Sequence, residues 1–234
     1  MTYQHVISHL QKLADPAIAS NSAKYFKSQF GEYGFGDFFL GIRVPVLRRC
    51  VRQYQDLGLT HIKKLLTSEY HEARLFSLLL MVKQFSKSDE AIKAKIYSLY
   101  ITHTKYINNW DLVDSSAPYI VGAWLLDKER ELLYQFASSP NLWKRRISML
   151  STANFIKNNQ FDDTFNIATL LLNDPHDLIH KAVGWMLREV GNRDREAEEK
   201  YLKQNYKAMP RTMLRYAIEK FEPAKRQLYL TGHI

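Results

Sequence analysis

The segment from Asn109 to Pro118 holds the residues of this 234-residue chain whose types and spacing best suit chemistry. Trp110 and Asp114 are four positions apart, and Asp111 precedes Asp114 by three, so a helix places all three side chains on neighbouring faces of one turn. A carboxylate beside a tryptophan can stabilise a developing positive charge or orient a water molecule as a base. The alternative is structural: Asp111 complements a helix N-terminus, Trp110 packs in the core and Asp114 pairs with an arginine. The pattern alone favours this alternative.

Two further clusters combine tryptophan with cations: Trp143 with Arg145 and Arg146, and Trp185 with Lys181 and Arg188. Indole rings among cations suit contact with sugars or bases that are flanked by phosphates. A tryptophan at helical spacing is also often a core residue.

The chemistry that the sequence lacks narrows the function. The eight histidines are scattered, and neither the pair His61 and His71 nor the pair His176 and His180 has a third ligand at a matching spacing, so we expect no metal site. A glycine-rich phosphate loop followed by Lys-Ser/Thr and a serine nucleophile elbow are both absent, and no cofactor is expected. Cys50 is the one cysteine, which excludes an intrachain disulfide and fits a reducing cytosol.

The charge balance points to a class of partner. The chain has 33 lysine and arginine residues against 24 aspartate and glutamate residues, a net charge of +9. Such an excess favours a polyanion, most simply nucleic acid. The N-terminal residues lack the apolar segment of a secretory signal, and the longest apolar run, Leu78 to Val82, is far shorter than a membrane span. We therefore expect no membrane partner and a location in a bacterial-type cytoplasm, at the nucleoid.

The elements that position these residues are expected to be helices. Apolar residues recur every three to four positions, and Asn-Gly and Asp-Gly turns are absent, which predicts an all-α protein. The stretch from Phe30 to Val44 contains four glycines and is predicted to be a long connection inside one domain. Prolines 140, 175 and 210 are 35 residues apart, and each precedes an amphipathic segment.

This period predicts an α-solenoid of HEAT-like helix pairs, in which each repeat packs against its neighbours. We expect a single domain over residues 1–234, with N-terminal helices over about residues 1–58 and helix-pair repeats over about residues 59–234.

The repeat register also aligns four cations: Arg74, Arg146, Lys181 and Arg215 are 72, 35 and 34 residues apart. Equivalent positions on stacked repeats lie on one face, which predicts a curved solenoid with a basic concave groove. The skipped repeat places Asp111 at the equivalent point, so an acid interrupts the row. The alternative is that each cation is an ordinary solvated charge on a polar helix face.

Four motifs occur in order along nearly the whole chain: Gly41-Ile42-Arg43-Val44-Pro45; Trp110-Asp111-Leu112-Val113-Asp114-Ser115 with Pro118; Asn141-Leu142-Trp143 with Arg146; and His180-Lys181-Ala182-Val183-Gly184-Trp185-Met186-Leu187-Arg188-Glu189. With these motifs the chain resembles the AlkD-type alkylpurine DNA glycosylases, all-helical proteins of HEAT-like repeats. The resemblance implies removal of cationic N3- and N7-alkylated purines, such as 3-methyladenine and 7-methylguanine, from duplex DNA without metal or cofactor. It also implies that the damaged base need not be flipped into a pocket.

The resemblance assigns roles to individual residues. Asp114 matches the catalytic aspartate, which would stabilise an oxocarbenium-like sugar and position water. Trp110 and Trp185 match the tryptophans that line the deoxyribose. Arg146 matches the family's groove arginine. Beyond that match, we expect contacts to the DNA backbone from Arg146 together with Lys181, Arg74, Arg215, Arg43 and Arg188, with Asp111 and Trp143 in supporting roles.

The expected partner is double-stranded DNA carrying alkylated purines, bound by a monomer that needs no protein partner. One alternative is a non-catalytic HEAT-repeat protein that binds damaged or branched DNA, which needs the cations but not Asp114. Another is a protein-binding solenoid, which leaves the aligned cations without a role. The chain departs from the family pattern at Asn109, where well-known members have a second tryptophan, and at Arg43 and Val44, where they have polar residues.

Overall fold

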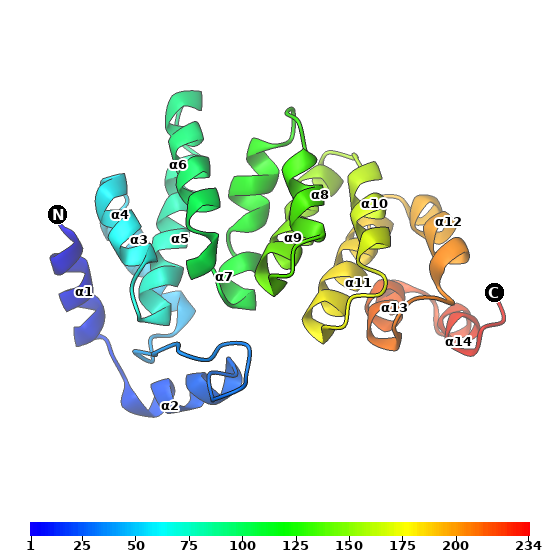
Figure 1. Ribbon diagram of the computed structural model, residues 1–234, viewed down its shortest axis with the longest axis horizontal. Coiled ribbons are helices and arrows are strands. Elements are labelled where there is room, and N and C mark those ends of the chain that lie inside the picture. The colour runs from blue at the N-terminus through cyan, green and yellow to red at the C-terminus, as the bar shows by residue number, and fades with distance from the viewer. The chain divides into compact units, whose positions relative to one another are not determined.

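The computed structural model describes residues 1–234 and contains fourteen α-helices, two 3-10 turns, one π-helical turn and no β-strand (Figure 1). The prediction of an all-α helical-repeat protein is confirmed. None of the helices combines the length and the hydropathy that a membrane span needs. The contacts within the chain form two compact units, Met1–Ile120 and Val121–Ile234, and each is described by itself. The single domain over residues 1–234 stays a prediction.

The first unit contains the helices α1 (Tyr3–Lys12), α2 (Pro16–Tyr25), α3 (Val44–Gln53), α4 (Leu59–Leu66), α5 (His71–Phe85), α6 (Glu90–Thr102) and α7 (Trp110–Asp114), with a 3-10 turn at Thr104–Tyr106. Helix α5 is the centre of this unit, because it packs against α3, α4, α6 and α7. Most of its side chains are buried, including the apolar run from Leu78 to Met81 except Leu79. A helix that is apolar on most sides is stable only when neighbours surround it.

The segment between α2 and α3 is the long connection that its glycines predict. Gly31, Gly36 and Gly41 have positive φ angles, which side chains disfavour. At Gly41 a Cβ atom would lie 2.1 Å from the Asp15 carbonyl oxygen, so only glycine fits. The buried Glu72 carboxylate accepts hydrogen bonds from the backbone N–H groups of residues 40, 41 and 42. This acceptor fastens the connection to the first turn of α5.

The second unit contains the helices α8 (Glu131–Ala137), α9 (Leu142–Lys157), α10 (Asp162–Leu170), α11 (Asp177–Gly191), α12 (Arg195–Asn205), α13 (Arg211–Ala217) and α14 (Pro223–Thr231), with a 3-10 turn at Ile218–Lys220. A π-helical turn, Pro118–Gly122, spans the boundary of the two units. Helix α11 packs against both α9 and α13. At Gly184 a Cβ atom would lie 2.4 Å from the Met213 carbonyl oxygen, so glycine permits this close approach of α11 and α13.

The three predicted helix starts of the second unit are confirmed. Helix α9 begins after Asn141, whose side chain accepts from the N–H groups of Trp143 and Lys144. Helix α11 begins after His176, whose ring accepts from the Leu178 N–H group, and α13 begins after Pro210. The period of about 35 residues is therefore the repeat from one of these packed helices to the next.

Candidate functional site

Helix α7 carries the Trp-Asp-Asp set and is only five residues long. Its N-cap is Asn109, whose Oδ1 accepts from the Trp110 N–H group at 2.9 Å. The Nδ2 atom of the same side chain donates to the Phe26 carbonyl oxygen at 3.3 Å. Asn109 is fully buried. The residue that departs from the family pattern therefore starts the helix and ties it to the end of α2.

Trp110 lies against an aromatic group rather than inside the core. It is partly exposed, and its ring stacks on Phe26 with centroids 5.5 Å apart and an interplanar angle of 28°. Tyr25 approaches the same indole edge-on at 5.9 Å and is itself 65% exposed. The structural alternative for Trp110, a buried core tryptophan, is therefore wrong.

Asp111 and Asp114 share α7 with Trp110, so the structure brings the three residues together on one turn as their spacing predicts. Both aspartates are partly exposed. Asp114 is the last residue of the helix, and Asp111 lies one turn earlier. Asp111 turns toward α5, where its Oδ2 accepts a hydrogen bond from Nε2 of His71 at 2.8 Å.

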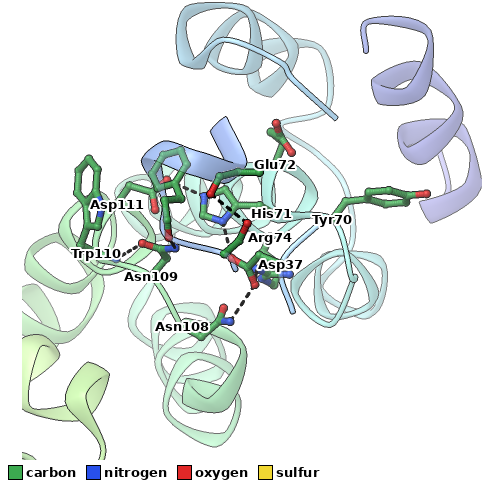
Figure 2. Close-up of polar contacts among 12 residues, drawn as sticks. Asp37, Tyr70, His71, Glu72, Arg74, Asn108, Asn109, Trp110 and Asp111 are labelled. Atoms are coloured by element: carbon green, nitrogen blue, oxygen red, sulfur yellow. Dashed lines mark hydrogen bonds and ion pairs between the residues drawn. The ribbon is translucent and has the colours of Figure 1, made fainter. Parts of the chain in front are cut away.

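His71, the first residue of α5, is nearly completely buried between two carboxylates (Figure 2). Its Nδ1 lies 2.9 Å from Oδ2 of Asp37, which belongs to the segment between α2 and α3. Burial by itself lowers the pKa of His71, but the charge of Asp111 and the hydrogen bonds to both aspartates outweigh it and raise the pKa to about 9. The ring is therefore an imidazolium at neutral pH.

Asp37 has three partners. Besides His71, it accepts from Nδ2 of Asn108 at 3.0 Å and pairs with Arg74 at 2.6 Å. Burial opposes ionisation of this carboxyl, but the hydrogen bond from His71 and the charge of Arg74 lower its pKa below the usual value. Asp37 is therefore an anion inside the first unit.

The structure corrects the prediction that Arg74 belongs to a row of cations facing a groove. It is 4% exposed, and besides its pair with Asp37 it donates from Nη1 to the carbonyl oxygens of Ser68 and Glu69. A guanidinium that is enclosed in this way does not face a phosphate. The repeat register places the residue correctly along α5, but packing turns the head group inward.

The structure also corrects the prediction for Arg146 on α9. It is 4% exposed, and its Nη1 donates to the Leu178 carbonyl oxygen at the start of α11. Its neighbour Arg145 pairs with Asp174 at 2.6 Å, and Trp143 is 7% exposed and packs as a core residue. This cluster therefore holds α9 against the start of α11, and the expectation that Arg146 faces a groove is wrong in this structure.

The remaining cations of the site prediction reach solvent to different degrees. Lys181 on α11 is partly exposed and pairs with Asp177 at 2.7 Å. Arg188 pairs with Glu219 and Glu189. Arg215 on α13 and Arg43, the residue before α3, are exposed. Of the four cations in the predicted row, Arg74 and Arg146 are buried, whereas Lys181 and Arg215 reach solvent.

Trp185 lies on α11 between Lys181 and Arg188, as the i, i+4, i+7 spacing predicts. It is partly exposed, and its Nε1 donates to the Glu189 carboxylate at 3.0 Å.

No three of the histidine, cysteine, aspartate and glutamate side chains are arranged to hold a metal ion.

Sequence reasoning considered His71 only as half of a histidine pair for a metal ion, and it missed Asp37 and Phe26. Phe26 and Asp37 are 11 residues apart at the end of α2 and in the connection that follows it, whereas His71 lies 34 residues beyond Asp37 on α5, and the structure brings the three together next to α7. The available signal was the density of aromatic residues between Tyr25 and Phe39, which is unusual for a glycine-rich connection.

Comparisons with known proteins agree with the fold. The family model described as "DNA alkylation repair enzyme" matches residues 6–221. Among solved structures, the chain is similar to a "Predicted DNA alkylation repair enzyme from Enterococcus faecalis", with a TM-score of 0.71 and 15% sequence identity over 90% of this chain and 97% of that chain. No curated protein matches the chain. The structural likeness at this identity shows the fold alone, whereas the family match spans nearly all of the residues.

Proposed function

Because this chain belongs to the DNA alkylation repair enzyme family, we propose that it is a DNA glycosylase that removes cationic N3- and N7-alkylated purines from duplex DNA. Membership makes the chain an enzyme of DNA repair that acts on DNA. The reaction class and the lesion are the proposal. One observation carries it: Trp110 and Asp114 are both partly exposed on a single turn whose start is anchored by a buried asparagine.

In the proposed reaction, the C1′–N9 bond of the alkylated nucleotide breaks, and its electron pair leaves with the purine. The base was cationic, so it departs neutral and needs little help from an acid. The sugar becomes oxocarbenium-like, and water then adds to C1′ and gives up a proton. The products are the free alkylated purine and an abasic site.

Asp114 is the proposed catalytic residue. Its carboxylate would stabilise the positive charge on the sugar and orient the attacking water, an interaction that is strongest in the transition state. The ring face of Trp110 adds a cation–π contribution to the same charge. Stacking on Phe26 supports this role, because a ring that is already packed on one side needs little further ordering.

The second unit is proposed to supply contacts to the DNA. Trp185 is the candidate for a sugar contact, and Lys181, Arg188 and Arg215 are candidates for phosphate contacts, together with Arg43 of the first unit. Arg74 and Arg146 are left out of this set, because each is 4% exposed and bonded to backbone carbonyl oxygens.

The test is release of base from methylated duplex DNA. Wild-type protein should release 7-methylguanine or 3-methyladenine, and the Asp114→Asn variant should be slower by about 10²-fold or more. Its affinity for DNA should stay within about twofold of wild type, because the carboxylate acts in the transition state. Asp56→Asn, an exposed aspartate of the same unit, is the matched control and should release base at the wild-type rate.

Two outcomes would contradict the proposal. Release by Asp114→Asn at the wild-type rate would remove Asp114 from the mechanism. Wild-type protein that binds duplex DNA but releases no base would instead support a non-catalytic DNA-binding member of the family.

A further inference from the structure

Four side chains of the first unit alternate in charge from its interior to α7: Arg74, Asp37, His71 and Asp111. The three contacts between them measure 2.6, 2.9 and 2.8 Å. The first three side chains are at most 5% exposed, and Asp111 is 14% exposed. Figure 2 shows His71 between the carboxylates of Asp37 and Asp111, with Trp110 beyond Asp111. The chain of charges therefore ends on the helix that carries Asp114.

We propose that His71 is a positioning residue: its imidazolium, held by Asp37, fixes Asp111 and through it the rotation of α7 that sets the Asp114 carboxylate and the Trp110 ring. This role rests on the proposed glycosylase function of the same site. His71 touches neither the lesion nor the water, and it acts through Asp111.

Because α7 is short, it needs contacts from other elements to fix its orientation. A five-residue helix has too few internal hydrogen bonds to be stable alone, so its orientation depends on its contacts. Helix α7 packs on α5, and Asn109 holds its first residue. The Oδ1 atom of Asp111 is buried without a hydrogen-bond partner, so the bond from His71 to Oδ2 is the contact that fixes this side chain.

His71 also reaches Trp110 through ring contacts. The centroid of its ring lies 4.8 Å from that of Phe26, and the Phe26 ring stacks on Trp110 at 5.5 Å. Phe39 stacks on His71 at 4.9 Å and lies parallel to Phe26. The same histidine therefore supports both functional residues of α7, Asp114 through the shared helix and Trp110 through Phe26.

The positive charge of His71 is part of its positioning role. An imidazolium donates from both ring nitrogens, whereas a neutral imidazole has one N–H group and can serve only one of the two carboxylates. The charged groups that face the ring are Asp37 from the segment before α3, Asp111 from α7 and Arg74 from its own helix. The positive ring also offsets the negative charge of Asp111. Because Asp111 lies one turn from Asp114, its charge would otherwise repel that of the Asp114 carboxylate.

The experiment measures base release under single-turnover conditions, with protein in excess over a duplex that carries one alkylated purine. The variants are His71→Gln, Asp111→Asn and their combination. His5→Gln, an exposed histidine of the same unit, is the matched control. We expect His71→Gln and Asp111→Asn each to slow release by about 10-fold to 100-fold, because small misplacements of a reacting group have effects of this size. The Kd for the duplex should change by less than about twofold, and His5→Gln should match wild type.

Two further readouts separate positioning from a merely structural role. The double variant should be no slower than His71→Gln alone, because both substitutions break the same connection. Nitrogen-15 NMR should show both ring nitrogens of His71 protonated at pH 7 in wild type. If His71→Gln does not fold, Asp111→Asn leaves the contact between His71 and Asp37 in place and carries the test.

The outcomes distinguish the two proposals. Wild-type protein that releases no base overturns the glycosylase function and the role of His71 with it. Wild-type release together with full single-turnover rates in folded His71→Gln and Asp111→Asn overturns only the role of His71. A loss of DNA affinity that accounts for the whole loss of rate overturns it as well, because His71 would then serve binding and not the positioning of α7.

Discussion

The Nη2 atom of Arg74 lies 2.6 Å from Oδ1 of Asp37, and only 5% and 2% of the two side chains are exposed. The pair joins α5 to the glycine-rich segment before α3, across 37 residues of sequence. It neutralises two charges that would be costly to bury separately. Arg74 therefore belongs to the framework that supports α7 and is not a surface cation.

Replacement of Arg74 is expected to cost stability. The variant Arg74→Met leaves Asp37 with one fewer positive partner and should lower the free energy of unfolding by about 3–5 kcal/mol, as for other broken buried pairs. Urea unfolding measures this change. Arg48→Met, at an exposed position on α3, is the control and should change stability by less than about 0.5 kcal/mol. Equal stability of the two variants would show that the buried pair contributes nothing.

His71 predicts a fall in stability with rising pH. Its pKa is about 9 in the folded protein against 6.5 as the ordinary value, so the folded state binds more protons than the unfolded state between these pH values. The stabilisation is fully present below pH 6.5 and is lost as the pH rises through about 9. It amounts to at most about 3 kcal/mol.

The measurement is the free energy of unfolding of wild type and His71→Gln from pH 6 to 10. Glu198 produces a fall of the same sign, since burial raises its pKa to about 8, so the difference between wild type and variant is the informative quantity. That difference should shrink as the pH rises. A constant difference would mean that His71 is not charged in the folded protein.

Asn109 makes two hydrogen bonds that can be separated. Asn109→Ala removes the cap of α7 and the bond to the Phe26 carbonyl oxygen, and it should destabilise the protein by about 1–3 kcal/mol. Asn109→Ser keeps a capping oxygen but cannot reach Phe26, so it should lie between alanine and wild type. Thermal unfolding ranks the three proteins. A serine variant no more stable than the alanine variant would mean that the cap contributes nothing.

The exposed cations predict how binding responds to salt. Contacts of the four candidate cations to about four phosphates give a slope of about −3.6 for the logarithm of affinity against the logarithm of salt concentration. Arg215→Ala should weaken binding and reduce this slope by about one, whereas Arg74→Met should leave the slope unchanged as long as the variant is folded. Fluorescence anisotropy with duplex DNA between 50 and 200 mM salt tests both. A flat response of wild type would contradict DNA binding altogether.

Several features were predictable from the sequence because their causes are local. The starts of α9, α11 and α13 each lie within two positions of a proline, and α9 and α11 also have a side chain that caps the helix. The helical period places Trp110, Asp111 and Asp114 on one turn without knowledge of any neighbour. The ordered motifs pointed to the family that the comparison found.

Tertiary structure alone decided which of the charged residues face solvent. The repeat register gives the position of Arg74 and Arg146 along their helices, but an arginine side chain can turn toward water or toward the interior from the same Cα position. Partners far away in sequence decide the direction: Asp37 for Arg74 and the Leu178 carbonyl oxygen for Arg146.

The contacts that His71 makes with Asp37 and Asp111, which support α7, could not be predicted from the sequence for the same reason. His71 meets Asp37 and Asp111, which are 34 and 40 residues away, only because the connection before α3 and helix α7 both pack on α5. Spacing along a chain reports contacts within one helix, whereas the charge of a buried histidine depends on groups that folding brings to it from other elements.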